Sequence, residues 1–474
     1  MRKVELLEET DEEMDEKDTG SRHIILPILL EILLLGILLL KTGKAALNYV
    51  YALIPLLLMT AVYGTRLYNH DGDMKLFGAC ASLTAIGTAL QVYVDALYKP
   101  LSGFSLLKMG MGMLVAVIFV LLYALLHKLL KKSWITYVLM ILAAFIYIVL
   151  LFKGYDPNGY GTSAWISIGS ITLQLTDVTK VAAVLFYASL FSTEAGRSDQ
   201  KVLWLSNIFF LINLIGSVLI YELGSFFILF FLHLSILFIF MKKGKKKRIY
   251  LLVVFGLCAF AVGLVYVLHA LLYGSAMAGT LPGFLARLWP LINKVYLRFS
   301  VTGNLELDPN GAGYQLLQGR KALWMSGLFG NTVNFHAIPV AESDMAFVAL
   351  CTGFGFIFAF AVVALFWRIW ISGSELSRKY LKNSTTDAIV VYGMTVLIFM
   401  QAGIVILGSC NVIPFTGLPI PFLSRGGTYQ AIVYSFSGLL LHMSESEVLN
   451  GGDDDDGSEE EIPDITIPAK NQAH

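Results

Sequence analysis

Residues 24–40 read IILPILLEILLLGILLL, and this stretch decides the fold class. Its only charged side chain is Glu31. A run of this length and apolarity can cross the hydrocarbon core of a bilayer, which is about 30 Å thick. The stretch therefore predicts a membrane-spanning helix.

The same pattern recurs along the whole chain. Of the 474 residues, 57% are hydrophobic and only 14% are charged, whereas a soluble domain carries roughly 25% charged residues. The sequence therefore predicts an all-α polytopic membrane protein with about 10–12 transmembrane helices and a long loop before the last three spans. The twelve predicted spans are residues 24–40, 47–64, 74–97, 106–127, 134–152, 178–195, 202–221, 223–242, 249–272, 344–370, 386–412 and 428–445.

Three short basic segments predict the orientation of these spans. They are KLLKKS (128–133), MKKGKKKR (241–248) and RIWISGSELSRKYLKN (368–383), and each follows an even-numbered span. Because basic loops stay in the cytoplasm, we expect a multi-pass membrane protein with both termini cytoplasmic. Three segments that we expect to be irregular then lie outside the cytoplasm, and the candidate active site with them. These are residues 153–177, 273–343 and 413–427.

The ends of the chain differ in composition from the membrane domain. Residues 1–22 are acidic, which predicts a cytoplasmic segment rather than a cleaved signal. Residues 23–445 form the predicted multispan domain, with the large loop 273–343. The tail 446–474 contains DDDDGSEEE, which is typical of a disordered cytoplasmic segment.

Several common signatures are missing from the sequence. There is no GxxxxGK[ST] and no GxGxxG following a strand, which argues against an ATP-driven transporter. HExxH and paired CxxC patterns are also missing, so the sequence predicts no metal-ligating residues and disfavours a zinc protease. We expect no nucleic-acid partner.

Few ionisable residues fall within the spans, and such residues are functional candidates because burying a charge in a membrane is costly. Asp177 and Lys180 stand at i, i+3 and share a helix face. A structural interpretation remains open, because Asp177 suits the first turn of a helix and Lys180 can snorkel to the interface. Structural roles are favoured for Glu31 and for Asp95, which closes the third span.

The stretch AESDMAFVALCTGFGF (341–356) places an acidic pair, Glu342 and Asp344, before an apolar run. A polar residue there is typical of a helix cap. Asp344 also lies at the end of the longest predicted loop, so a catalytic role is the alternative to capping.

Four stretches together resemble the SEDS family (shape, elongation, division, sporulation), which includes RodA, FtsW and SpoVE. NGYGTSAWISIGSITLQLTDVTK (158–180) is similar to the family's NGxxRWIxxG…QPSExxK, and YELG (221–224) to its PDLG. GYQLLQGRKALWMSGLFG (313–330), followed by ESDMAF, is similar to its GYQ…GLxG and TDF stretches. PFTGLPIPFLSRGG (414–427) is similar to PxTGxPLPFxSxGG. The resemblance predicts a family core at about 74–445.

The resemblance implies a peptidoglycan glycosyltransferase of the bacterial plasma membrane. Such an enzyme polymerises glycan strands from lipid II, a disaccharide-peptide on undecaprenyl diphosphate, together with a class B penicillin-binding protein. The resemblance places the family's essential aspartate at Asp344, which would act as general base. Lys180 and Arg298 are candidates for stabilising the diphosphate, with Asp177 orienting Lys180, and a divalent cation (Mg or Mn) could share that work. Further candidate substrate contacts are Trp165, Gln315, Ser424, Gly426 and Gly427, although the turn at 424–427 can also be a purely structural kink.

The chain departs from the family pattern at several positions. Leu175-Thr176-Asp177 replaces Pro-Ser-Glu, Thr352-Gly353 replaces acidic residues, and Arg425 replaces an aromatic residue. Two predicted spans also precede the core. The alternative functions are a lipid II flippase or related transporter, a scaffold for a transpeptidase, and an O-antigen ligase or polymerase.

Overall fold

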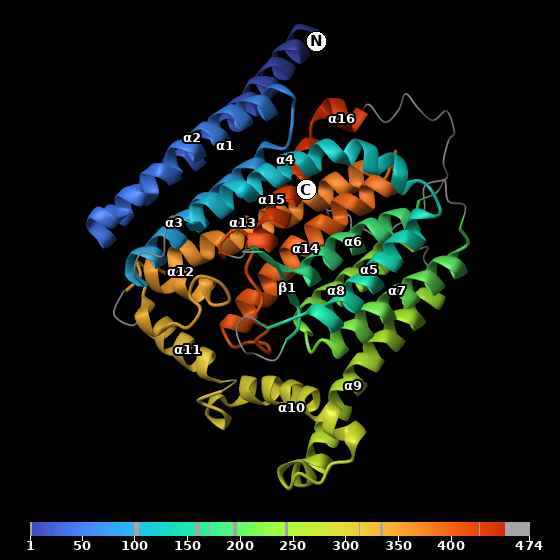
Figure 1. Ribbon diagram of the computed structural model, residues 1–474. Coiled ribbons are helices and arrows are strands. Elements are labelled where there is room, and N and C mark those ends of the chain that lie inside the picture. The colour runs from blue at the N-terminus through green and yellow to red at the C-terminus, as the bar shows by residue number, and fades with distance from the viewer. Residues whose placement is uncertain are drawn as a thin grey trace. The chain divides into compact units, whose positions relative to one another are not determined.

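The computed structural model is built almost entirely of helices (Figure 1). The chain divides into two compact units. Among the described residues, the first comprises those up to Lys128, Lys321–Gly403 and 418–450, and the second comprises Leu129–Arg320 and Ile404–Gly417. The structure describes residues 2–98, 104–156, 162–169, 171–192, 197–241, 245–311, 313–331, 335–425 and 427–450.

The first unit is a helical bundle with α3 (Met74–Tyr98) at its centre. In the most apolar part of this helix 89% of the residues are buried, and α3 packs against α1, α2, α12, α13 and α15. The final residues of α4 and α14 continue into the second unit. The other helices of the first unit are α1 (Arg2–Thr42), α2 (Leu47–Asn69), α4 (Phe104–Leu130), α12 (Ala346–Phe354), α13 (Phe356–Tyr380), α14 (Thr385–Ser409), α15 (Gly427–Met443) and α16 (Ser446–Asn450), with 3-10 turns η1 (Gly43–Ala46) and η4 (Phe335–Ala337).

The second unit combines helices with one β-hairpin. Strands β1 (Trp165–Ile168) and β2 (Ile171–Gln174) pair antiparallel, with Trp165 opposite Gln174. The Phe186 and Phe209 rings stack at 4.0 Å between centroids and join α6 to α7. The helices of this unit are α5 (Ile135–Lys153), α6 (Leu175–Leu190), α7 (Asp199–Leu219), α8 (Gly224–Phe240), α9 (Lys245–Met277), α10 (Gly283–Gly303) and the first half of α11 (Tyr314–Ser326), with the 3-10 turn η3 (Leu305–Leu307).

The predicted spans agree well with the helices. Each of the twelve predicted ranges overlaps a helix. Within the described part of the chain, nine helices are long and apolar enough to cross a membrane, and α8 is a shorter apolar helix. Helices α6, α8 and α15 are shorter, with 16, 17 and 17 residues. The prediction of an all-α polytopic membrane protein is confirmed.

The tenth predicted span, 344–370, was wrong in its extent. The helix breaks at Gly355, which has a φ of 94° and separates α12 from α13. A Cβ on Gly355 would collide with the carbonyl oxygen of Leu328, so only glycine fits this break. Helix α13 then runs to Tyr380, ten residues beyond the predicted end.

Three predicted loops are also more regular than expected. The basic segment 368–383 is helical as far as Tyr380, because Arg378 and Lys379 suit the negative end of a helix and need not end it. Segments 153–177 and 273–343 contain the β-hairpin and the helices α10 and α11. Segment 413–427 agrees with the expectation in its described part, because residues 413–425 hold neither helix nor strand.

Helices α1 and α2 form an antiparallel pair beside α3 (Figure 1). The acidic residues from Arg2 onwards belong to the same helix as the first span. Glu31 is fully buried in this pair, and Thr60 Oγ1 donates to its Oε1 at 2.9 Å. This hydrogen bond joins α1 to α2, which fits the structural role favoured for Glu31.

Candidate active site

Asp344 lies in a tight turn that leads into helix α12. The amides of Ser343 and Met345 donate to the Val340 carbonyl oxygen at 3.0 and 3.2 Å. Helix α12 begins at Ala346 and its N-cap residue is Met345. Asp344 therefore does not occupy the N-cap position that the capping interpretation requires. Its side chain is partly buried, and the Ser343 hydroxyl donates to its Oδ1 at 2.8 Å.

A second turn, residues 420–425, packs directly against the first. The Ser424 hydroxyl donates to the Ser343 carbonyl oxygen at 2.8 Å. The Arg425 amide donates to the Glu342 carbonyl oxygen at 2.7 Å. These two bonds join the PFLSRGG motif to the residues immediately before Asp344.

Gln91 of α3 connects the two turns, 340–345 and 420–425, which we call the paired turns. Its buried Nε2 donates to the carbonyl oxygens of Glu342 at 3.1 Å and Leu423 at 2.6 Å. One side-chain amide thus satisfies a backbone acceptor in each turn, as buried carbonyl groups require. The position of Asp344 is therefore tied to the central helix of the first unit.

The backbone of the second turn comes unusually close to α3. A Cβ on Gly87 would collide with the Phe422 carbonyl oxygen. Phe422 has a φ of 63°, and a bulky residue keeps such a conformation only where surrounding contacts fix it. The close approach to α3 and the hydrogen bond from the Phe422 amide to Gln430 Oε1 of α15 at 3.0 Å together hold the shape of this turn.

An ion pair between Arg425 and Asp95 also fixes the second turn to α3. Both side chains are mostly buried. Sequence reasoning noted Asp95 only as the acid that closes a span, and Arg425 only as a departure from the family pattern. In the structure these two residues are partners, next to the Arg425–Glu342 backbone bond.

Thr352, which departs from the family's acidic pattern, has a packing role in this chain. Its side chain is buried, and its hydroxyl donates to the Val348 carbonyl oxygen at 2.9 Å. Ser326 Oγ donates to Thr352 Oγ1 at 3.2 Å and joins α11 to α12.

In the second unit, Asp177 and Lys180 form a buried ion pair on α6. Lys180 Nζ lies 2.8 Å from Asp177 Oδ1, and the two side chains are 2% and 1% exposed. The snorkelling interpretation of Lys180 is therefore wrong, because the ammonium group points to a buried acid. Asp177 does lie in the first turn of the helix, and Gln174 is the N-cap residue.

The β-hairpin positions the start of α6. Trp165 packs on a core formed by residues of α5 and Ile220, including Leu150. The Leu175 amide donates to the Ala164 carbonyl oxygen at 3.2 Å. The predicted contact residue Trp165 thus supports the helix that carries Asp177 and Lys180.

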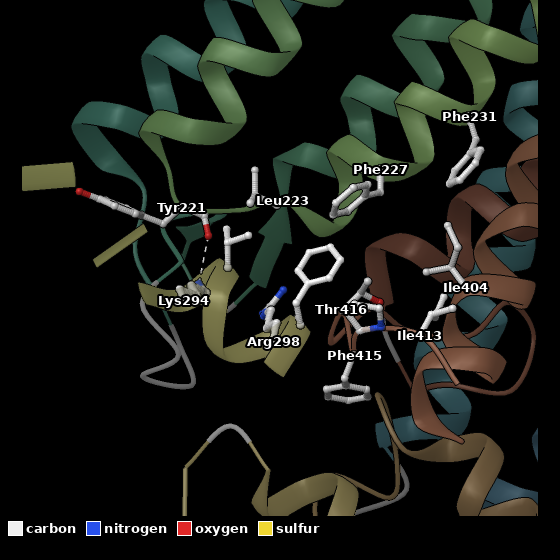
Figure 2. Close-up of a pocket in the computed structure, with 13 residues that line it drawn as sticks. Tyr221, Leu223, Phe227, Phe231, Lys294, Arg298, Ile404, Ile413, Phe415 and Thr416 are labelled. Atoms are coloured by element: carbon white, nitrogen blue, oxygen red, sulfur yellow. Dashed lines mark hydrogen bonds between the residues drawn. The ribbon is translucent and has the colours of Figure 1, made fainter. Parts of the chain in front are cut away.

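A cavity of about 170 Å³ lies against α8 and α10 in the second unit (Figure 2). Lys294 and Arg298 stand one helical turn apart on α10, so they share a face, and both line the cavity. Lys294 Nζ donates to the Tyr221 carbonyl oxygen at 3.0 Å. The remaining lining residues are mostly apolar: Tyr221, Leu223, Phe227, Phe231, Val295, Phe299, Ile404, Ile413, Pro414, Phe415 and Thr416.

The environment of Lys294 lowers its pKa to about 8. Burial is the main cause, because it disfavours the charged ammonium form. The neighbouring Arg298 cation lowers the pKa further, while Glu222 and Asp156 oppose the shift. Arg298 was predicted from the sequence, but Lys294 was not. The spacing of four residues between them places both on one face of an amphipathic helix, and this pattern could have indicated Lys294.

The other predicted contacts lie in different settings. Ser424 is buried, and its hydroxyl also accepts from the Ile420 amide at 2.8 Å. Gly427 is the first residue of α15, and Gln315 is partly buried near the start of α11. Gly426 lies outside the described residues. Asp344, Ser424 and Gly427 belong to the first unit, and the second unit holds Trp165, Asp177, Lys180, Arg298 and Gln315.

The divalent cation stays a prediction. In the part of the chain that the structure describes, no group of three or more His, Cys, Asp or Glu side chains gathers as a metal site. Two cationic side chains, Lys294 and Arg298, line the cavity and none of its lining residues is acidic, so the cavity lining does not fit a divalent cation. We therefore assign no chemical step to a metal.

These features define a polytopic membrane protein with a carboxylate on a braced turn and a cationic, apolar-walled cavity. The sequence model of the FtsW/RodA/SpoVE family, described as cell cycle proteins, matches residues 74–448. The chain belongs to this family, and the predicted resemblance is confirmed. Helices α1 and α2 precede the matched region.

Known proteins agree with this assignment. The chain is 27% identical over 303 residues to a probable peptidoglycan glycosyltransferase FtsW from Enterococcus hirae, covering 61% of this chain and 69% of that protein. Its fold is similar to a chain from a structure of a peptidoglycan synthase complex, with a TM-score of 0.57 and 19% identity over 79% of this chain and 97% of the other. RodA of Thermus thermophilus has a TM-score of 0.51 and 17% identity, with 79% and 96% covered.

Proposed function

We propose that this chain is a peptidoglycan glycosyltransferase that polymerises glycan strands from lipid II. The observation that carries the proposal is the cavity against α10, where Lys294 and Arg298 stand in an apolar wall. A polyprenyl diphosphate has the complementary chemistry, with an anionic diphosphate joined to an apolar tail. Family membership and the names of relatives support the reaction class.

In this proposal the cavity holds the diphosphate of the donor. The bond between the donor's anomeric carbon and the diphosphate oxygen breaks, and the electron pair leaves with the diphosphate. Arg298 can bind phosphate oxygens in a bidentate manner, whereas Lys294 supplies a point charge. Lys180 stays a second candidate for this role, with its position fixed by Asp177.

Asp344 is the general base of the proposed reaction. The acceptor's sugar hydroxyl attacks the anomeric carbon, and its proton passes to the Asp344 carboxylate. The partly buried side chain and its hydrogen bond from Ser343 support this role, since a base must be held in one orientation to accept a proton.

We further propose that the paired turns face the outside of the cell and that both termini are cytoplasmic. The bias of basic residues among the loops supports this orientation. A class B penicillin-binding protein is the proposed partner, supported by the resemblance and by the peptidoglycan synthase complex among similar folds.

The function is tested with the full-length protein reconstituted in vesicles with lipid II, with and without a class B penicillin-binding protein. We expect glycan polymers, resolved by gel electrophoresis, from the chain with its partner. Fluorescent lipid II that crosses the bilayer without any polymer would instead identify a flippase. If the partner polymerises lipid II by itself and this chain adds no polymerase activity, the chain is a scaffold.

The cavity predicts a distinctive pH dependence. We expect kcat/KM for lipid II to fall as pH rises through about 8, because Lys294 loses its proton there and with it the charge that binds diphosphate. Lys294→Met should lower kcat/KM at neutral pH roughly tenfold or more, the value of a charge-assisted hydrogen bond. Lys294→Arg should keep the neutral-pH activity and remove this step from the profile. A wild-type profile without the step, or an unaffected Lys294→Met protein, would contradict the assignment.

The Arg425–Asp95 pair predicts coupled effects on catalysis. Arg425→Gln and Asp95→Asn should each lower kcat more than they change KM, because each loosens the turn that braces Asp344. The double variant should lose less than the sum of the two, with a coupling of about 0.5–3 kcal/mol. The exposed Arg378→Gln is the matched control. Strictly additive losses would show that the pair does not position the site.

A further inference from the structure

A short apolar segment of the first unit lies exposed outside the candidate spans. It comprises residues 324–329, which we call the apolar tip, at the end of α11 and in the turn that follows. Its side chains are Trp324, Leu328 and Phe329, which are 85%, 61% and 75% exposed, and Met325. So many large apolar groups in one exposed turn mark a contact surface.

Backbone hydrogen bonds hold the apolar tip against the start of span α13. The Phe356 amide donates to the Gly327 carbonyl oxygen at 3.2 Å, and the Ile357 amide donates to that of Leu328 at 3.4 Å. Phe356 is the first residue of a candidate span. The apolar tip therefore lies level with the end of that span.

A second span end reaches the same segment independently. Lys41 stands in the last turn of the span Gly20–Thr42, and its Nζ donates to the Phe329 carbonyl oxygen at 3.2 Å. Two spans distant in the sequence thus end beside the apolar tip. A segment at the ends of two spans lies at the depth of the bilayer interface, where aromatic residues such as Trp324 concentrate.

The surroundings favour lipid over a protein partner. Leu40 on α1 and Phe360 on α13 are also exposed, so the apolar surface of the tip continues onto the lipid-facing sides of two spans. Lys41 adds positive charge beside it, and the exposed Lys44 follows three residues later in η1. Positive charge suits anionic lipid headgroups.

We propose that the apolar tip inserts into the membrane at the boundary between headgroups and acyl chains. Trp324, Leu328 and Phe329 enter the acyl region, and Lys41 and Lys44 contact lipid phosphates. Helix α12 joins this anchor to the turn that carries Asp344, because Ser326 Oγ and Thr352 Oγ1 are hydrogen-bonded at 3.2 Å. The anchor thereby sets the depth of α12 relative to the lipid surface, independently of the reaction catalysed.

The test measures tryptophan fluorescence of the full-length chain in vesicles of phosphatidylcholine and phosphatidylglycerol. Phospholipids brominated at a shallow or at a deep acyl position serve as quenchers. The Trp324 signal is the difference between the wild-type protein and Trp324→Phe, a variant that retains an apolar ring. We expect shallow bromine to quench this signal more than deep bromine, with aqueous iodide ineffective.

Trp367 provides the matched control, because it is exposed near the middle of span α13. The signal removed by Trp367→Phe should be quenched most by deep bromine. A Trp324 signal that iodide quenches and neither lipid affects would overturn the proposal, and so would one quenched most by deep bromine. A Trp324 signal insensitive to all three quenchers would also overturn it, because the apolar tip is then covered by protein.

Discussion

Asp344→Asn is expected to abolish most glycan polymerisation while leaving the fold intact. The loss should be roughly 10²- to 10⁴-fold in kcat, the usual contribution of a positioned general base. Asparagine has nearly the same shape, and its carbonyl oxygen can still accept the hydrogen bond from Ser343 that Asp344 Oδ1 accepts at 2.8 Å. The substitution removes the capacity to take a proton and the negative charge. Polymer formation from lipid II is the measurement, with thermal unfolding as the check on folding.

The neighbouring acid supplies the control for this prediction. Glu342 contributes its backbone carbonyl oxygen to the bonds from Gln91 and Arg425, so Glu342→Gln should polymerise at nearly the wild-type rate. If both variants lose activity equally, local charge rather than one base controls the reaction. An Asp344→Asn protein of wild-type rate would remove Asp344 from the mechanism.

The positions of the helices were largely predictable, because crossing a membrane imposes a minimum apolar length that a sequence shows directly. The break at Gly355 was not predictable in the same way. The run 344–370 has charged residues only near its ends, at Asp344 and Arg368. The glycine is required because the Leu328 carbonyl oxygen approaches it from another segment. Helices α10 and α11 were not predicted. Their segments are too polar to span a membrane, so we assigned them to a loop.

The candidate site shows the same division between local and distant information. Spacing of i, i+3 placed Asp177 and Lys180 on one face, and the structure has them bonded at 2.8 Å. Local pattern alone made Asp344 a helix cap, although Met345 takes that position. The Arg425–Asp95 pair joins residues far apart in the chain, so no local pattern could have indicated it.

Lys180→Met is expected to give the largest loss of stability among the variants considered. It leaves the Asp177 carboxylate buried and unpaired, which costs about 3–5 kcal/mol. Asp177 Oδ2 has no hydrogen-bond partner among the described residues, so the carboxylate depends on the ammonium group of Lys180 that its Oδ1 contacts. The thermal unfolding midpoint in detergent should fall steeply. Lys201→Met, which removes an exposed lysine of α7, should leave the midpoint unchanged.

The double variant Asp177→Leu/Lys180→Met separates a structural role from a functional one. Replacing both members of a buried ion pair by apolar groups is often neutral or stabilising, so most of the lost stability should return. If Lys180 contacts the diphosphate, this stable protein should still show a KM for lipid II raised roughly tenfold or more, as the loss of a charge-assisted bond requires. Recovery of both stability and the wild-type KM would make the pair purely structural and leave diphosphate binding to Lys294 and Arg298. Stability alone cannot decide between these roles, because a buried pair resists single substitution in either case.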